Sequence, residues 1–162
     1  MPRYPISRLV GPMFVWLLTV AAGCGAALLL GYSLAAVLPV AVLLAAPALL
    51  SLVLLPAVRH DWAQGLVLLI WTGFAVVMAL LGGLNILLIV FLCVPAVGMM
   101  FFRGRVLEGL ALGAAALVAT VLGAGYLGAI PTPLSAPSQA LLPIVGMAAT
   151  LALVIAGMIA AN

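Results

Sequence analysis

The chain has 162 residues, of which 69% are hydrophobic and 4% are charged, and five basic and two acidic residues give a formal net charge of +3. A soluble domain carries about a quarter charged residues, so this composition excludes an ordinary soluble domain. The basic residues are arginines scattered among apolar runs, and a nucleic-acid-binding surface is also excluded because it needs a basic stripe.

Long apolar runs follow one another along the whole chain. Each has about the 20 residues that match the hydrocarbon thickness of a bilayer in helical form. The runs are continuous and do not alternate with polar residues, so they predict helices and not the strands of a barrel. We therefore expect an all-α, polytopic membrane protein, with one transmembrane domain over residues 1–162 in which six helices form an antiparallel bundle. The expected spans are residues 9–30, 34–58, 62–81, 85–102, 106–130 and 141–161.

The connections between these spans are short, with one exception. The sequences GYS, RHD, GGL and RGR join neighbouring spans, and such short turns place consecutive helices antiparallel and side by side. The long connection is PTPLSAPSQA, residues 131–140. Its three prolines predict an extended loop outside any helix.

The positions of the charges predict how the bundle is oriented. With six spans, the N-terminus, the RHD turn, the RGR turn and the C-terminus share one side of the membrane. All the arginines fall on that side, and arginine is enriched in cytoplasmic loops. We therefore expect a bacterial inner-membrane protein with both termini in the cytoplasm. The arginines are Arg3, Arg8, Arg59, Arg103 and Arg105.

Small residues recur at steps of three and four along the fifth expected span, which lets another helix approach closely. They are Gly109, Gly113, Ala116, Thr120 and Gly123. The sixth span carries a weaker version of this pattern, formed by Gly146, Thr150 and Gly157.

Prolines inside the spans predict kinks, because each removes a helical hydrogen bond. They are Pro39 and Pro47 in the second span and Pro95 in the fourth. We interpret these kinks as static bends in preference to hinges. Trp16 and Trp71 lie deeper than an interfacial aromatic belt, and we interpret them as packing against helices or lipid.

The sequence contains no catalytic constellation. His60 and Asp61 are neighbours in an expected cytoplasmic turn, but adjacent residues in a turn point in different directions, and no nucleophile is near them. Asp61 is instead expected to cap the third helix. Glu108 lies in the first turn of the fifth helix, where the helix dipole favours an acid and an arginine can pair with it. The candidates for topology or signalling are Arg59, His60, Asp61, Arg103, Arg105 and Glu108.

Cys24 and Cys93 lie inside apolar runs and have no metal-ligand spacing. We therefore expect no metal site, no disulfide and no cofactor bound to this chain. Residues 1–24, which end in AAGC, also have features of a lipoprotein signal. The charge alternation of the later turns argues against this alternative, since it holds only if the first span stays in place.

The stretches expected at the membrane midplane contain no acid, base or amide. A transporter or channel needs polar groups or broken helices there, and a proton relay needs ionisable groups. A thin pathway lined by threonines stays open as an alternative, although threonines more often serve in packing. These residues are Thr19, Thr72, Thr120 and Thr150. Transport is therefore the weaker class of function.

The second half of the chain resembles a known family. A Gly-Gly turn begins at Gly82, Pro95 lies within a span, an R-x-R-x-x-E-G turn begins at Arg103, and a P-x-P loop begins at Pro131 after a small-residue helix. Over roughly residues 59–162 this order is similar to the N-terminal membrane region of bacterial sensor histidine kinases, in particular the DivJ-like kinases of alphaproteobacteria.

The resemblance implies the sensory input and anchoring domain of a two-component sensor histidine kinase. In that family a phosphoacceptor histidine and an ATP-binding domain follow the membrane region. No H-E-x-x-x-P segment and no glycine-rich ATP lid occur in this sequence, so catalytic residues and ATP are expected only in a cytoplasmic kinase domain. We interpret the apolar ending ALVIAGMIAAN as a truncation, beyond which the sixth helix continues into that domain.

The expected partners are the lipid bilayer, a second copy of the chain in a homodimer and another membrane protein, with no nucleic acid. Two other classes of function stay open. One is a small membrane transporter or channel subunit, and the other is a structural anchor or assembly protein.

Overall fold

A computed structural model describes residues 7–57, 61–82 and 134–161, together with a few single positions between them. These positions are Val94, Ala96, Val97, Gly113, Ala116, Ala119 and Thr120. In the continuous stretches the regular structure is helical: α1 (Ser7–Leu29), α2 (Leu34–Val53), the 3-10 turn η1 (Leu55–Ala57), α3 (Asp61–Gly82) and α6 (Ala136–Ala161). The fourth and fifth expected spans, residues 85–102 and 106–130, lie outside the described residues apart from those single positions.

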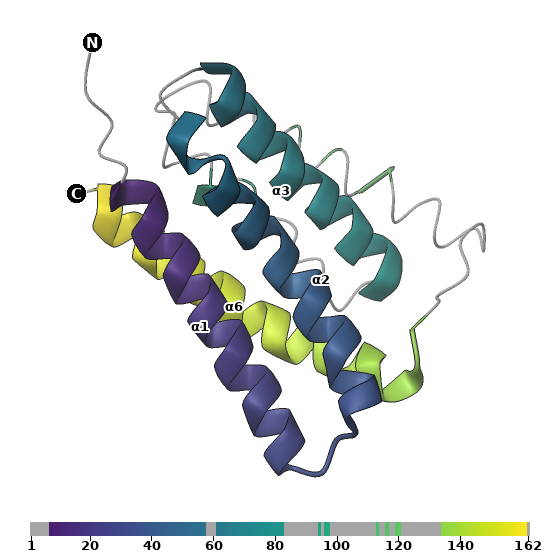
Figure 1. The fold of residues 1–162 in the computed structure, drawn as a ribbon. Coiled ribbons are helices and arrows are strands. Elements are labelled where there is room, and N and C mark those ends of the chain that lie inside the picture. The colour runs from purple at the N-terminus through teal and green to yellow at the C-terminus, as the bar shows by residue number, and fades with distance from the viewer. Residues whose placement is uncertain are drawn as a thin grey trace.

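The described helices pack side by side as a bundle (Figure 1). The start of α1, the end of α2, the start of α3 and the end of α6 lie at one end of this bundle, as expected for antiparallel neighbours. Helix α6 passes behind α1 and α2 in this view, and it contacts α1, α2 and α3. The all-helical class predicted from the apolar runs is therefore confirmed over the described part of the chain.

The turn between α1 and α2 is set by a glycine. Gly31 has a φ of 92°, a left-handed conformation that favours glycine because it has no Cβ. The amide of Tyr32 donates to the carbonyl of Ala27 over 3.1 Å, and the amide of Gly31 donates to that of Leu28 over 3.1 Å. This pair of bonds is a Schellman motif, which satisfies the last carbonyls of α1. The chain then reverses within a few residues, so α2 returns alongside α1.

The second expected span is wrong at its end, because α2 stops at Val53 and does not reach residue 58. The chain tightens into η1, in which the amide of Ala57 donates to the carbonyl of Leu54 over 2.9 Å. Pro56 explains the change, since it has no amide hydrogen and disfavours helical geometry at the residue before it.

The predicted loop over residues 131–140 is wrong in its second half, because α6 begins at Ala136 and not at residue 141. Pro137 lies in the first turn of the helix, where a backbone N–H has no intrahelical partner and proline is therefore well tolerated. The amide of Gln139 donates to the carbonyl of Ser135 over 2.9 Å and closes that first turn. Helix α2 continues through Pro39 and Pro47, while Pro95 lies outside the described residues.

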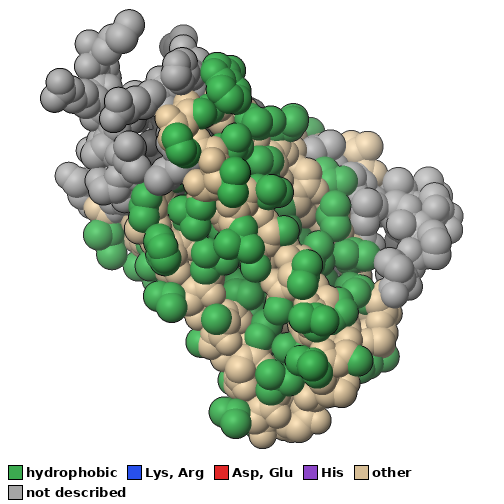
Figure 2. All heavy atoms as spheres, in the orientation of Figure 1, with side chains coloured by type: hydrophobic (Ala, Val, Ile, Leu, Met, Phe, Trp, Pro, Cys, Tyr) green, Lys and Arg blue, Asp and Glu red, His purple; other side chains and the backbone are tan. Residues whose placement is uncertain are grey.

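Among the described helices, three are long and apolar enough to cross a membrane, over Leu9–Leu29, Leu34–Val53 and Ala136–Ile159. Helix α3 also contains an apolar stretch, Trp62–Met78. Many large hydrophobic side chains of the described helices are exposed, and such side chains are spread over the face shown in Figure 2. A soluble monomer rarely exposes such a continuous apolar surface, whereas lipid accommodates it. Length and surface together indicate a helical protein inserted in a membrane.

Candidate functional site

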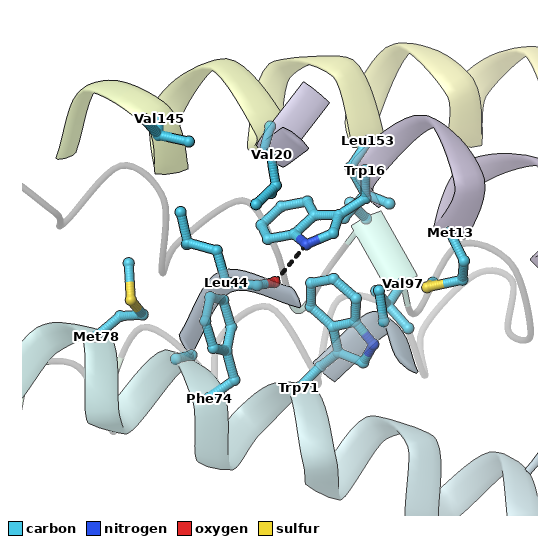
Figure 3. Packing of buried hydrophobic residues seen from close by; sticks show 14 of the residues in the cluster. Met13, Trp16, Val20, Leu44, Trp71, Phe74, Met78, Val97, Val145 and Leu153 are labelled. Atoms are coloured by element: carbon cyan, nitrogen blue, oxygen red, sulfur yellow. Dashed lines mark hydrogen bonds between the residues drawn. The ribbon is translucent and has the colours of Figure 1, made fainter. Parts of the chain in front are cut away.

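Three aromatic side chains meet at the centre of the bundle (Figure 3). The ring centroids of Trp16 and Trp71 are 5.0 Å apart with their planes at 81°, and each ring also lies edge-on to Phe74, at 5.9 Å and 5.8 Å. Edge-to-face pairs of this kind each contribute about 0.5–1.5 kcal/mol beyond the area they bury. Both tryptophans have no exposed surface. We call these three residues the aromatic cluster; it joins α1 to α3.

Both buried indoles use their N–H groups on helix α2. Trp16 Nε1 donates to the carbonyl oxygen of Leu44 over 2.7 Å, and Trp71 Nε1 donates to Ser51 Oγ over 2.9 Å. Ser51 Oγ in turn donates to the carbonyl oxygen of Pro47 over 2.7 Å. The two indoles therefore hold α2 on either side of Pro47, one from α1 and one from α3.

These bonds lie close to a proline of α2. Pro47 has no N–H, so it supplies no donor to the carbonyl of Leu43, and its ring disturbs the preceding turn of the helix. Carbonyls near such a position are open to donors from neighbouring helices or side chains, which is how membrane helices tolerate proline. Leu44 lies in that preceding turn and accepts from Trp16, while Ser51 bridges the turn that follows.

A groove lies beside this network, between α2 and α3. It has a volume of about 170 Å³, opens to the outside of the bundle, and is lined entirely by apolar residues. Phe74 belongs both to the groove and to the aromatic cluster. The lining residues are Leu43, Ala46, Pro47, Leu50, Ile70, Phe74 and Val77.

Helix α6 packs closely on α1. A Cβ placed on Gly23 would lie 3.0 Å from Val145 Cγ1, so the side chain of Val145 occupies the space that the glycine leaves. On α6, Gly146, Thr150 and Gly157 are all buried, as are Ala149 and Leu153 between them. Small residues thus lie on the inner face of α6, where the sequence pattern expected a close helix approach.

The first turn of α6 is held by polar contacts. Ser138 is 1% exposed, and its Oγ donates to the carbonyl oxygen of Ala36 in α2 over 2.9 Å. Its Oγ also lies 2.8 Å from Ser135 Oγ, and Gln139 Nε2 donates to the carbonyl oxygen of Leu134 over 3.1 Å. This end of α6 is therefore fixed to the start of α2. The sequence pattern missed these residues because they lie in the predicted loop.

The charged candidates lie mostly outside the described residues. They are Arg59, His60, Arg103, Arg105 and Glu108, and the same is true of the packing candidates Gly109, Gly123 and Pro95. Asp61 is the first residue of α3, so it lies at the helix start where its capping role was expected, and that role stays a prediction. Gly113, Ala116 and Thr120 are described and exposed, and the hydroxyl of Thr120 donates to the carbonyl of Ala116 over 2.9 Å.

The threonines of the suggested pathway each bond to their own helix. Thr19, Thr72 and Thr150 donate to the carbonyls four residues earlier, those of Val15, Leu68 and Gly146, each over 2.8 Å. Thr120 does the same. Hydroxyls engaged in this way are typical of packing residues in membrane helices, and this favours the packing interpretation over a lined pathway.

Cys24 is a free, buried thiol near the end of helix α1, which continues past it to Leu29. Cys93 lies outside the described residues, and the described part of the chain contains no group of three or more His, Cys, Asp or Glu residues that could hold a metal.

The buried polar side chains of the described helices serve to hold the helices together. The buried polar side chains of the described residues are Ser51, Gln64, Ser138 and Thr150, none of which is ionisable near neutral pH. Every buried side-chain polar atom in this part of the chain has a hydrogen-bond partner. Such satisfied networks give a bundle one defined arrangement, because an unpaired polar group in hydrocarbon is costly.

The fold and this core indicate a helical membrane protein whose central tryptophans tie three helices together. No known protein family, curated protein or solved structure matches the chain.

Proposed function

We propose that this chain is the membrane-embedded sensory input and anchoring domain of a two-component sensor histidine kinase in a bacterial inner membrane. In this proposal six helices span the membrane with both termini in the cytoplasm, the domain forms a homodimer, and the last helix passes the signal to a cytoplasmic kinase. The assignment to a kinase depends on the sequence resemblance over residues 59–162.

The observation that carries the proposal is the position of α6. This helix contacts α1, α2 and α3, so a rearrangement of any of them reaches it. Its first turn is bonded to α2 through Ser138, and its inner face packs on α1 through small and apolar side chains. One end of the helix is fixed by hydrogen bonds, whereas the rest packs mainly through small and apolar side chains. Such a helix can tilt or rotate at its other end, as signalling helices do.

The character of the core favours this function over transport. The buried polar side chains of the described residues are hydrogen-bonded. Substrate and ion pathways need polar or ionisable groups that face one another near the midplane. A signalling or anchoring bundle needs only a well-packed core with a helix that leads out of it.

A helix-phase experiment tests the proposal. The chain is fused after Asn162 to the cytoplasmic part of a sensor histidine kinase, and one to seven alanines are inserted at the junction. Each insertion rotates the kinase by about 100° relative to α6, because an α-helix has 3.6 residues per turn. Autophosphorylation in membranes is expected to rise and fall with a period of three to four alanines.

Two controls separate the other classes of function. An unrelated membrane anchor fused to the same kinase is expected to give autophosphorylation that does not vary periodically with the number of alanines. If the fusion of this domain also gives no periodic variation, the domain is an anchor and not an input domain. Purified protein in liposomes is expected to show no substrate-dependent flux of common ions. Saturable flux together with a flat alanine series would identify a transporter and contradict the proposal.

A further inference from the structure

Helix α2 contains two prolines, and a side chain of another helix bonds to the turn before each of them. The carbonyl of Leu44, three residues before Pro47, accepts the indole N–H of Trp16 over 2.7 Å (Figure 3). The bond from α6 ends at the carbonyl of Ala36, three residues before Pro39. A proline supplies no N–H to the preceding turn, so a donor from a neighbouring helix replaces part of what is missing. Both prolines therefore lie at interhelical contacts, but the helices on their two sides differ.

The two sides of Pro39 are bonded to helices that also pack on each other. The side before it is bonded to α6 through Ser138, and the side after it is bonded to α1 through Trp16. Among the described helices α1 and α6 share the most extensive interface, in which Val145 fills the space beside Gly23. A change of angle at Pro39 would separate these two helices, so this proline is fixed by the α1–α6 interface.

The two sides of Pro47 are bonded to helices that share little contact outside the aromatic cluster. The side before it is bonded to α1 at Leu44. The side after it is bonded to α3, because Ser51 Oγ accepts the indole N–H of Trp71 over 2.9 Å. Apolar contacts are non-directional, so packed helices can slide along them without losing a hydrogen bond. A change of angle at Pro47 therefore keeps both bonds to α2.

An open groove leaves space for movement at this proline. It lies between α2 and α3 and has a volume of about 170 Å³. Its lining includes Leu43, Ala46 and Pro47 from α2, and Phe74 and Val77 from α3. Two of these α2 residues precede the proline, so the groove separates α3 from the part of α2 that is bonded to α1. All its lining side chains are apolar, and its walls can approach or separate without breaking a hydrogen bond between them.

We propose that Pro47 is a hinge about which α3, together with residues 48–57, swings relative to α1, α6 and residues 34–46. The interhelical bonds before the proline hold α1, α6 and the first part of α2 together as one body. The bond between Trp71 and Ser51 holds the second body together. The groove is wider in one arrangement and narrower in the other. This differs from the static bend that the sequence favours at this proline. The hinge does not depend on the proposed function, whereas its use in signalling does.

Distances between two spin labels test the hinge in the full chain in liposomes. Both native cysteines are replaced, and labelled cysteines are placed at Leu66 of α3 and Leu151 of α6, which are exposed and belong to different bodies. Leu66 lies about 12 Å along α3 from Phe74 in the groove, so a swing of about 20° moves it by about 4 Å. The distance distribution should therefore be about 4 Å broader than that of a control pair within the first body, at Leu18 of α1 and Leu151.

Two substitutions at the hinge should narrow the distribution of the first pair to the width of the control pair. Pro47→Ala restores a backbone N–H, and Ala46→Leu fills the groove and keeps its walls apart. Pro39→Ala and Ala35→Leu are the matched controls, because they change the other proline of α2 and an exposed alanine outside the groove. Both should keep the broad distribution. A parent distribution as narrow as that of the control pair, or a broad one that neither hinge variant narrows, would overturn the hinge.

The kinase fusion tests the use of the hinge in signalling. Pro47→Ala should change autophosphorylation at least about fivefold, the lower end of typical allosteric coupling, while Pro39→Ala should leave it unchanged. This result together with the expected distances supports the hinge and its signalling role. If the alanine series is periodic and Pro47→Ala leaves autophosphorylation unchanged, the signalling role of the hinge is contradicted.

The distances and the alanine series also separate the hinge from the proposed function. A broad distribution that Pro47→Ala narrows, with an alanine series that does not vary periodically, supports the hinge and contradicts the proposed function. A periodic alanine series with a narrow distribution in the parent contradicts the hinge and leaves the proposed function supported.

Discussion

Replacing Trp16 by phenylalanine tests whether the aromatic cluster holds the bundle together. The substitution keeps an aromatic ring but removes the indole N–H that donates to the Leu44 carbonyl over 2.7 Å. Hydrogen bonds between membrane helices are worth about 0.6 kcal/mol on average and up to about 1.7 kcal/mol. The lost ring leaves about 40 Å³ unfilled, which at about 24 cal/mol per Å³ costs about 1 kcal/mol. Trp16→Phe should therefore lower the free energy of unfolding by about 2 kcal/mol.

Unfolding in mixed micelles of increasing denaturing detergent measures this change, with the emission of the remaining tryptophans as the signal. Trp62→Phe is the matched control, because Trp62 is 61% exposed and lies outside the aromatic cluster. It should change the free energy of unfolding by no more than about 0.5 kcal/mol, as surface substitutions usually do. If the two variants unfold at the same detergent fraction, the cluster does not stabilise the bundle as described.

Further substitutions test the other contacts in the same unfolding assay. Gly23→Ala places a Cβ 3.0 Å from a methyl group of α6, whereas the Cβ of Gly25→Ala meets nothing within 4 Å. The Gly23→Ala protein should therefore be less stable than the Gly25→Ala protein by about 1–2 kcal/mol. Equal stability of the two proteins would show that α1 and α6 do not pack this closely. Ser138→Ala should cost about 1 kcal/mol and Ser33→Ala less, because Ser33 makes no side-chain capping bond. Ser51→Ala leaves a buried indole N–H unpaired and should cost about 1–3 kcal/mol, and this cost should fall in a background with Trp71→Phe if the two groups are bonded.

The sequence predicts the helices where hydrophobicity alone decides their extent. Helix α3 runs over Asp61–Gly82, within a residue of the expected span at each end, since RHD and GGL turns flank an unbroken apolar run. The errors lie at prolines. Pro56 ends α2 early, while Pro137 starts α6 early, because the effect of a proline depends on whether its missing N–H would have had a partner.

The core could be predicted only in part. Trp16 and Trp71 were expected to lie deep in their spans, and packing against helices was one of the two interpretations; the structure places both in the bundle centre. Their acceptors could not be identified, because the carbonyl of Leu44 is a backbone atom that no residue pattern marks, and its pairing depends on how α1 is rotated against α2. Ser51 is the one available signal, as a polar residue in the apolar run of the second span.

The groove could not be predicted for a similar reason. Its lining residues have the same types as those that face lipid, and only the packing of α2 on α3 separates them from the other apolar side chains. Ser138 shows the same limit, because its bond to Ala36 joins positions 102 residues apart in the sequence. Contacts of this kind depend on the tertiary arrangement and leave no local pattern.

The proposed signalling function requires that α6 crosses the membrane from an outer start to a cytoplasmic end. A single cysteine at Ser135, in a chain without Cys24 and Cys93, can be labelled in intact cells with a maleimide that does not cross the inner membrane. We expect Ser135→Cys to be labelled from outside, while an epitope fused after Asn162 is reached only after the membrane is permeabilised. A cysteine at position 135 that reacts only after permeabilisation would place both ends of α6 on the same side and contradict the account.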